Sequence, residues 1–204
     1  MKKLLIATHN PAKTTEIKSA LNELKEQGVE LLTLDDVGVE KEPEETGKTF
    51  QENSALKAKF YSKLTNLATI ADDGGLIIPF LGNAPGVRSR RWPGYEAGDQ
   101  ELIDYTLSHL KNARRDERTA FLETCVTFFY PPTGQIFFEQ EKIKGHIAEI
   151  PSPRPTNGYP YRALFVVDEF GKYYDELTHE EHDKINHRYK ALRKLTKRIE
   201  NLIS

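Results

Sequence analysis

The chain has 204 residues, of which 38% are hydrophobic and 29% charged, a composition typical of a globular protein with a buried core. Its 29 lysines and arginines against 31 aspartates and glutamates leave a formal net charge of −2, which excludes a strong overall attraction to nucleic acid or to an anionic membrane. The single cysteine, Cys125, excludes an internal disulfide, no apolar run reaches membrane-spanning length, and the apolar start is too short for a secretory signal, so we expect a cytoplasmic protein.

The first quarter of the chain predicts a strand, a helix and a second strand, followed by a loop. Residues 4–8 predict a buried strand, and apolar side chains recur at helical spacing over residues 13–25. A second strand is predicted at residues 29–34, and the acidic stretch at residues 35–48 predicts a loop. Because a helical crossover makes the two strands that it joins parallel, we expect a parallel pair here.

The middle of the chain centres on a pair of aspartates. Thr49 and Glu52 form a capping box that predicts the start of a helix. The apolar run at residues 67–71 predicts a strand that ends in a tight turn at Asp-Asp-Gly-Gly, residues 72–75, so that the acids lie at an edge of the sheet. After a loop rich in glycine and arginine, Asp99 predicts the cap of the next helix.

The second half of the chain predicts a hairpin and a shaped loop. Strands at residues 121–130 and 135–143 flank the sequence Pro-Pro-Thr-Gly and predict an antiparallel pair. The stretch at residues 152–161 is rich in proline and glycine and predicts a loop, which leads to a strand at residues 163–167.

The carboxy-terminal region predicts helices and carries a basic run. Thr178 and Glu181 form a second capping box, and apolar residues at helical spacing predict a last helix. We interpret the basic side chains of that helix as a solvated face; the alternative is a surface that binds RNA, which the overall charge weakens. These side chains are Lys190, Arg193, Lys194, Lys197 and Arg198.

Two groups of polar residues indicate phosphate chemistry. Residues 8–13 join a strand to the start of a helix, where free N–H groups and the helix dipole favour an anion. The alternative interpretation of this segment is an ordinary capped turn. The second group combines acids with a lysine, as in a Mg²⁺ site that bridges substrate phosphates; the alternative is a solvated acidic loop and a helix cap. Its members are Glu44, Glu45, Lys57, Asp72 and Asp73.

A third group has the chemistry of a base pocket. The sequence Asn-His-Arg at residues 186–188 and the loop at residues 157–162 supply tyrosines that can stack on a base and arginines that can donate to ring acceptors.

Four blocks of sequence carry a resemblance to a known family. They are T-H-N-P-A-K at residues 8–13, E-E-T-G-K-T-F-Q-E-N with the following K-A within residues 44–58, A-D-D-G-G-L with L-G and A-P-G-V within residues 71–87, and H-R with A-L within residues 187–192. In this order and over nearly the whole chain, the blocks resemble those of the Ham1-like inosine triphosphate pyrophosphatases, which hydrolyse non-standard purine nucleoside triphosphates.

The resemblance implies a fold, partners and roles for particular residues. It implies an α/β fold with a mixed, elongated central sheet flanked by helices, in one domain over residues 1–204 whose two lobes enclose a nucleotide cleft. It implies a homodimer that binds Mg²⁺ and a nucleoside triphosphate, but no nucleic acid or membrane. It implies metal binding by Glu45 and Asp73, and catalysis by Asp73 and Lys57, with Asp72 or Asp73 taking a proton from the attacking water. Substrate binding falls on Thr8, His9, Asn10, Lys13, Gly74, Tyr159, Arg162, Lys184, His187 and Arg188.

The base-reading region departs from the family pattern. Where the family has Gly-Phe-Gly-Tyr-Asp-Pro, this chain has Gly-Tyr-Pro-Tyr-Arg-Ala at residues 158–163, and His182 replaces the family's lysine. Because an arginine offers only donors, we expect Arg162 to pair with O6 and N7 of a 6-oxopurine. The alternative is that Arg162 faces solvent or pairs with Glu149 or Asp168.

The resemblance implies hydrolysis of inosine, deoxyinosine or xanthosine triphosphate to the monophosphate and pyrophosphate, by attack of water on the α-phosphorus. Three alternatives stay open at this point: a pyrophosphatase for other modified nucleotides, such as pyrimidines, a nucleotide sensor that binds without hydrolysis, and the RNA-binding protein named above. Release of pyrophosphate from a panel of triphosphates separates them.

Overall fold

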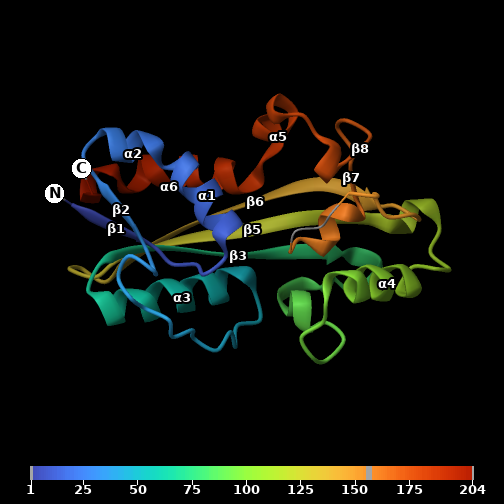
Figure 1. The fold of residues 1–204 in the computed structure, drawn as a ribbon, viewed down its shortest axis with the longest axis horizontal. Helices are drawn as coiled ribbons and strands as arrows, with labels where there is room; N and C mark the ends of the chain where they lie inside the picture. The colour runs from blue at the N-terminus through green and yellow to red at the C-terminus, as the bar shows by residue number, and fades with distance from the viewer. Residues whose placement is uncertain (1, 155–157, 204) are drawn as a thin grey trace. The chain divides into compact units, whose positions relative to one another are not determined.

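Two compact units make up the chain. The computed structural model describes residues 2–154 and 158–203 (Figure 1). The first unit comprises Met1–Asp73, Thr124–Glu141 and His187–Ser204, and the second comprises Gly74–Glu123 and Lys142–Asn186. Each unit has a hydrophobic core formed by its own residues.

The first unit begins with the expected parallel strands. Their register pairs Leu4 with Leu31, and Leu4 with Ala68 on the other side. The helix expected over residues 13–25 is interrupted: Leu21 has φ −99° and ψ 12° and ends the first of two helices. The elements concerned are β1 (Lys3–Ile6), α1 (Pro11–Ala20), α2 (Asn22–Glu26), β2 (Glu30–Thr33) and the start of β3 (Ala68–Ile78).

Helices cover both faces of these strands. In Figure 1, α1, α2 and α6 (His187–Ile203) lie on one side of β1 and β2, and α3 (Phe50–Thr65) lies on the other. The side chains of β1 alternate accordingly. Leu4 and Ile6 belong to the same buried cluster as residues of α1 and α6, whereas Leu5 and Ala7 pack with residues of α3.

The capping box predicted at the start of α3 is half correct. Thr49 caps the helix, since its Oγ1 accepts the Glu52 N–H at 3.1 Å. The Glu52 carboxylate does not return to Thr49, however, and instead accepts the Lys48 N–H at 2.6 Å. The loop that precedes the helix is thereby held by Glu52.

The strand that carries the aspartate pair runs on past it, so the predicted tight turn at residues 72–75 is wrong. β3 continues through both glycines to Ile78, and its last residues pair antiparallel with β4 (Ala84–Pro85), Ile77 opposite Pro85. Both glycines can extend like any other residue, and here the ladder of neighbouring strands keeps the segment straight. Asp72 is buried within the strand instead of lying at an edge.

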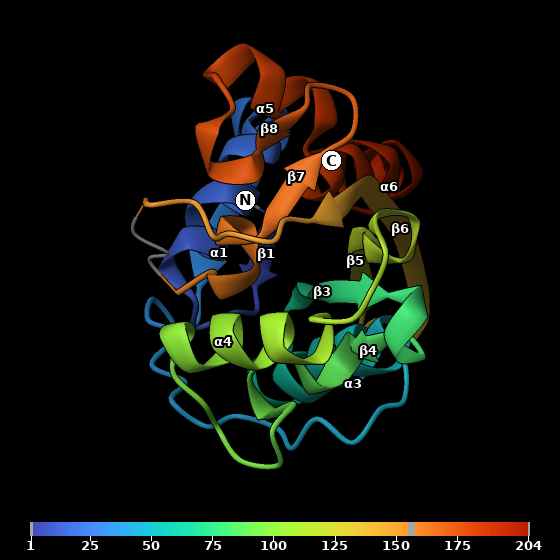
Figure 2. The same cartoon turned by 90° about the vertical axis from the view of Figure 1, so that its right-hand side faces the viewer.

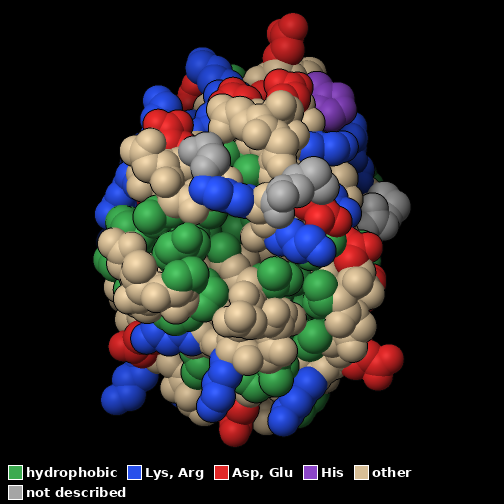
Figure 3. Space-filling view, turned by 90° about the vertical axis from the view of Figure 1, so that its left-hand side faces the viewer, with side chains coloured by type: hydrophobic (Ala, Val, Ile, Leu, Met, Phe, Trp, Pro, Cys, Tyr) green, Lys and Arg blue, Asp and Glu red, His purple; other side chains and the backbone are tan. Residues whose placement is uncertain are grey.

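The expected hairpin is confirmed as two neighbouring long strands. β5 (Thr119–Tyr130) and β6 (Gln135–Ile147) are joined by a turn in which the Gly134 N–H donates to the Tyr130 carbonyl at 2.9 Å. The sheet order is β2-β1-β3-β5-β6-β7-β8, with β4 on β3. Figure 3 views the side on which this turn lies, where hydrophobic side chains gather among charged ones. The exposed large hydrophobic residues described in the first unit are Leu64, Ile136 and Phe138.

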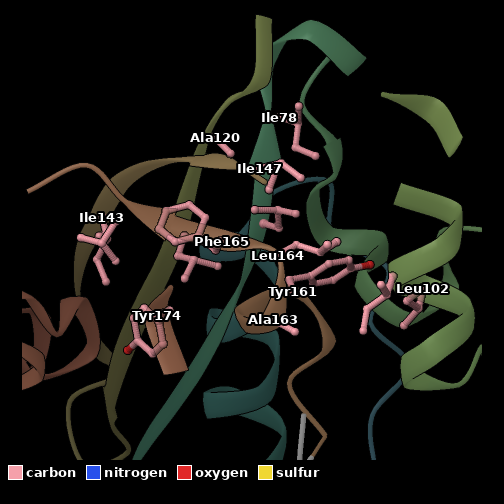
Figure 4. Close-up of a cluster of buried hydrophobic side chains, with 14 of the residues drawn as sticks. Ile78, Leu102, Ala120, Ile143, Ile147, Tyr161, Ala163, Leu164, Phe165 and Tyr174 are labelled. Atoms are coloured by element: carbon pink, nitrogen blue, oxygen red, sulfur yellow. The ribbon is translucent and has the colours of Figure 1, made fainter. Parts of the chain in front are cut away.

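The second unit packs a short 3₁₀ segment against its sheet. Tyr161, Leu164 and Phe165 lie in one buried cluster with Leu102 of α4 and Ile147 of β6 (Figure 4). In Figure 2, α4 and α5 lie on different sides of β7. The elements are α4 (Asp99–His109), the 3₁₀ segment Pro160–Ala163, β7 (Phe165–Val167), β8 (Lys172–Tyr173) and α5 (His179–Ile185).

Two helix caps of the second unit have different outcomes. The capping box of Thr178 and Glu181 is confirmed at the start of α5. Asp99 does not cap α4, because Gly98 holds the cap position and Asp99 is the first helical residue. Its carboxylate is bonded to Arg90 and Gly158 instead.

The fold is thus a mixed α/β fold with a central, mostly antiparallel sheet flanked by helices. Within residues 2–154 and 158–203, no helix combines the length and the apolar character that crossing a membrane requires.

Candidate active site

The loop between β1 and α1 is a capped turn. The Asn10 Oδ1 accepts the N–H groups of Ala12 at 2.9 Å and Lys13 at 3.2 Å, and Pro11 occupies the first helical position. The Thr8 Oγ1 accepts the Asn10 N–H at 3.2 Å. This is the ordinary capping that the sequence allowed, and it also directs the start of α1 and Lys13 toward Asp72, in the middle of β3.

Asp72 lies at the centre of a buried network of charges. Its Oδ2 is 3.1 Å from the Lys13 Nζ and 3.1 Å from the Arg188 Nε, and its side chain is 0% exposed. Arg188 also pairs with Glu16 of α1. Burial would raise the pKa of Asp72, but the two cations outweigh it and hold this pKa well below the usual range. Asp72 is therefore a fixed anion that has no capacity to take a proton near neutral pH.

Asp73 has different partners and a different protonation tendency. Its Oδ1 is 3.2 Å from the Lys57 Nζ, and its Oδ2 accepts a hydrogen bond from the Asn53 Nδ2 at 3.1 Å. Lys57 also donates to the Glu45 Oε1 at 2.9 Å. Burial raises the pKa of Asp73 despite the nearby Lys57 and Lys13.

The lysine that joins these acids stays charged. Burial would lower the pKa of Lys57, but the carboxylates of Asp73, Asp72 and Glu45 raise it above its ordinary value. The pKa of Lys13 is lowered instead, because its burial outweighs the attraction of Asp72.

The alternation of β3 separates the two aspartates. Neighbouring side chains of a strand point to opposite faces of its sheet. Asp72 meets Lys13 of α1 and Arg188 of α6, the helices on one face, and Asp73 meets Lys57 of α3 on the other. One carboxylate is thus fixed between two cations, while the other belongs to an acid–lysine–acid group that can take up a metal or a proton.

Two residues that the sequence reasoning did not single out support the charged side chains around the two aspartates. The Asn53 Oδ1 accepts the Gly47 N–H at 2.8 Å while its Nδ2 reaches Asp73, so that one amide joins the acidic loop to β3. A Cβ on Gly47 would lie 2.5 Å from the Asn53 Oδ1 and 2.9 Å from the Asn53 N, so only glycine fits there. The second residue is Glu16, which lies three positions after Lys13 on α1 and could have been noticed by that spacing.

The predicted carboxylate ligands fit a divalent cation that keeps water and substrate ligands. Glu45 and Asp73 meet at one ammonium group, and Mg²⁺ is usually held by one or two carboxylates plus phosphate oxygens. Among the residues that the structure describes, no group of three or more His, Cys, Asp or Glu side chains is placed to hold a metal. The donor set therefore fits a metal bound together with its substrate.

Within the first unit, the charges of this region leave one carboxylate in excess. Three cations (Lys13, Lys57, Arg188) are paired with four acids (Glu16, Glu45, Asp72, Asp73), which gives a balance of 3 − 4 = −1 if all are ionised. A net negative charge in a partly buried cluster favours either a bound cation or the protonation of one acid.

The remaining predicted residues of the first unit lie as follows. His9 lies edge-on to Tyr61, with ring centroids 6.2 Å apart, and its Nε2 is 4.0 Å from the Glu42 carboxylate. His187 is the first residue of α6 and, like Arg188, is buried.

In the second unit, the predicted base-reading residues form a stack. The Arg162 guanidinium lies over the ring of Tyr159, 3.7 Å from its centroid, and 4.8 Å from that of Tyr174. The Tyr174 hydroxyl is bonded to His182 at 2.9 Å. Neither stacking contact was expected, because the sequence predicted that Arg162 pairs with a base, faces solvent or pairs with an acid. Asn157 of the predicted loop lies outside the described residues.

Two further predicted residues belong to the second unit. Lys184 pairs with Glu169 at 2.7 Å, and its side chain is largely exposed. Gly74 directly follows Asp73 within β3.

The basic face of α6 pairs with the first unit's own acids. Lys194 is bonded to Glu141 and Arg198 to Glu139, both on β6. The sequence predicted a solvated face, because no acid lies between these basic residues along the helix. Glu139 and Glu141 come from a distant part of the chain and could not be foreseen. Such pairing leaves less free charge for RNA than the sequence of the helix implies.

The chain is similar to known proteins over nearly its full length. The model of the Ham1 family matches residues 4–198. A relative named dITP/XTP pyrophosphatase from Bacillus subtilis is 40% identical over 200 residues, 98% of this chain and 98% of that protein. The structure of a HAM1 protein from Coxiella burnetii has a TM-score of 0.85 at 31% identity, over 98% of this chain and 100% of that one. A structure titled nucleoside-triphosphatase and dITP/XTP pyrophosphatase from Mycobacterium abscessus has a TM-score of 0.78 at 36% identity, over 95% of this chain and 98% of that one.

Proposed function

Because this chain belongs to the Ham1 family, we propose that it hydrolyses non-standard purine nucleoside triphosphates, such as dITP, ITP and XTP, to the monophosphate and pyrophosphate. The observation that carries the proposal is the group of Glu45, Lys57 and Asp73, which joins two carboxylates to one buried ammonium at 2.9 Å and 3.2 Å. Relatives that are named dITP/XTP pyrophosphatase support the choice of substrate.

Asp73 is the residue that takes the proton of the attacking water. Water attacks the α-phosphorus, the bond from that phosphorus to the bridging oxygen breaks, and pyrophosphate leaves with the electron pair. The raised pKa of Asp73 brings the carboxylate closer to the operating pH, which favours a general base. Asp72 is unsuited to this step, because Lys13 and Arg188 hold its pKa low and its side chain has no exposed surface.

The cations of the first unit bind and neutralise phosphate. Lys57 stays protonated and lies beside the acid that receives the proton, so its charge is placed to offset charge that develops on the phosphates. Lys13 follows the capped start of α1, where backbone N–H groups favour an anion. Glu45 and Asp73 would hold Mg²⁺, which when bound neutralises phosphate charge and lowers the pKa of water.

The proposal extends to the base and to the assembly. The Arg162 guanidinium covers one face of the Tyr159 ring, so a purine would stack on the opposite face, with His187 and Arg188 as further contacts. The working form is a homodimer. The exposed Ile136 and Phe138 on β6 are apolar surface of the kind that a second copy can cover.

The test is the release of pyrophosphate from the triphosphates of inosine, deoxyinosine, xanthosine, guanosine, adenosine and modified pyrimidines, each with and without Mg²⁺. We expect Mg²⁺-dependent release that is fastest with the 6-oxopurines inosine and xanthosine. Tight binding of one triphosphate without release from any of them would contradict hydrolysis and favour a sensor.

A further inference from the structure

The loop that carries Tyr159 is held at Gly158 through both the N–H and the carbonyl of that residue. The Gly158 N–H donates to the Asp99 Oδ2 at 3.0 Å, and the Gly158 carbonyl accepts from the Arg90 Nη2 at 3.3 Å. The same Arg90 nitrogen donates to the other oxygen of Asp99, and the Arg90 Nη1 donates to the Ala97 carbonyl at 3.2 Å. Arg90 and Asp99 therefore form one ion pair that binds the backbone of Gly158, a residue far away in the sequence.

The two bonds restrict the backbone of Gly158. Its φ is +83°, a value that residues other than glycine rarely adopt, and glycine loses more backbone freedom on folding than any other residue. Two bonds to an ion pair fix the direction in which the chain leaves Gly158. The next residue, Tyr159, takes its backbone direction from that point.

A third bond fixes the loop two residues further on. The Tyr161 hydroxyl donates to the Ser89 carbonyl at 2.9 Å, and Ser89 itself has φ +39°, which is uncommon for serine. Burial raises the pKa of Tyr161 above its ordinary value, so this hydroxyl keeps its proton and stays a donor. The segment that contains Ser89 and Arg90 thus holds the loop on both sides of Tyr159.

Between these fixed points, Tyr159 and Arg162 share one face. Tyr159 precedes the 3₁₀ segment Pro160–Ala163 and Arg162 lies within it, and the Arg162 guanidinium reaches back over the Tyr159 ring. Pro160, Tyr161 and Ala163 are buried, whereas Tyr159 and Arg162 are half-buried, so the stacked pair lies at the rim of the core, against the buried ring of Tyr174.

We infer that Arg90 and Asp99 are positioning residues for base recognition: their ion pair orients the Tyr159 ring, and with it Arg162, for a purine base. The inference rests on the proposed function, in which this ring stacks on the base. It assigns neither residue a contact with substrate. Loss of the pair should therefore weaken selection of the base and leave the binding of phosphate unchanged.

The experiment compares the wild type with Asp99→Ala, Asp99→Asn, Arg90→Ala and Arg90→Lys on inosine and adenosine triphosphates. We expect Asp99→Ala to raise KM for inosine triphosphate about tenfold, the effect of losing one or two hydrogen bonds. We expect kcat to change by less than about twofold, which is the pattern of lost ground-state binding. The preference for inosine over adenosine triphosphate should shrink, and Asp99→Asn, which keeps an acceptor for the Gly158 N–H, should recover part of it.

Three further measurements separate positioning from a general structural role. The inhibition constant of inorganic tripolyphosphate, which has no base, should be the same in all variants. Asp104→Ala, which removes an exposed acid from the same helix, should match the wild type throughout. The double variant Arg90→Ala/Asp99→Ala should be no worse than Asp99→Ala, because both residues hold one peptide segment.

Calorimetric titration with inosine triphosphate in the absence of Mg²⁺ makes the comparison without turnover. If the wild type hydrolyses nothing, the proposed function fails, while a weaker affinity of Asp99→Asn and Arg90→Lys for inosine triphosphate would still support positioning. Equal losses on both nucleotides and on tripolyphosphate, or no change in any variant, would overturn the inference. Should Asp99→Ala fail to fold, the two conservative variants decide.

Discussion

Adjacent aspartates of β3 should respond in opposite ways to the same change from carboxylate to amide. We expect Asp73→Asn to lower turnover by about 10²- to 10⁴-fold, the usual contribution of a general base. An amide at this place can accept from Asn53 or from Lys57, but not from both, because its nitrogen is a donor. That loss is offset by relief from burying a charge, so the free energy of unfolding should change little.

Asp72→Asn should cost stability instead. It leaves Lys13 and Arg188 without the anion that both contact at 3.1 Å, and removing one partner of a buried ion pair costs about 3–5 kcal/mol. Because Arg188 keeps Glu16, we expect the lower end, about 3 kcal/mol. At roughly 2–4 °C per kcal/mol for a protein of this size, Tm should fall by about 6–12 °C.

The two variants should also differ in how their stability depends on pH. Asp72 has a lowered pKa in the folded state, so its stabilisation is present above the ordinary value of 3.8 and is lost only as pH falls through the folded value. Asp73 has a raised pKa, so the folded state loses stability as pH rises from 3.8 through its folded value. Relative to the wild type, Asp73→Asn should therefore become more stable, and Asp72→Asn less stable, as pH rises across the acid range.

Thermal unfolding followed by circular dichroism between pH 2 and 8, together with pyrophosphate release at neutral pH, measures both effects. Each variant serves as the matched control of the other, because the substitution and the strand are the same. The reasoning is refuted if Asp73→Asn keeps wild-type turnover, or if Asp73→Asn loses the larger part of the stability while Asp72→Asn unfolds like the wild type.

Three other changes test the surroundings of Asp73 and the stack in the second unit. Lys57→Met should lower turnover by about 10²- to 10³-fold, as loss of a donor to the transition state does, and wild-type rates in a steady-state assay would rule out its role. Gly47→Ala should cost about 1–3 kcal/mol by overpacking, because its Cβ would lie 2.5 Å from the Asn53 Oδ1; unchanged chemical denaturation would contradict this. Arg162→Ala should cost roughly 10- to 100-fold in kcat/KM on 6-oxopurines if the guanidinium reads the base, since a bidentate contact is worth about 1–3 kcal/mol. Equal, small changes on inosine, xanthosine, guanosine and adenosine triphosphates would exclude that reading.

The parts of the fold that depend on local pattern could be predicted from the sequence. The parallel strands at the start, the cap at Thr49 and the capping box at Thr178 follow from spacing along the chain, and the structure has them. The end of the strand at residues 72–75 could not be predicted in this way. Glycines usually interrupt a strand, but the pairing that keeps these two extended comes from other segments.

Burial in a strand also decided what the aspartate pair can do. The sequence grouped Asp72 with Asp73, since nothing local distinguishes two neighbouring acids. The period of two along a strand places them against different helices, and those helices carry different partners. Had the segment turned at the glycines, both acids would have been solvated and equivalent. The strand therefore supplies the asymmetry between a fixed anion and a candidate base.

The two groups of candidate site residues differ in how far a sequence can assign them. Lys13, Lys57 and Asp73 lie in short sequence motifs whose residue types alone indicate phosphate or metal binding. The orientation of Tyr159 depends on Arg90 and Asp99, which come from a distant loop and from the start of a helix. Asp99 was expected to cap that helix, and this alone would have fully explained its presence. A residue that satisfies a simple local pattern can thus have its main contact elsewhere, and in this chain that contact holds Gly158, the residue before Tyr159.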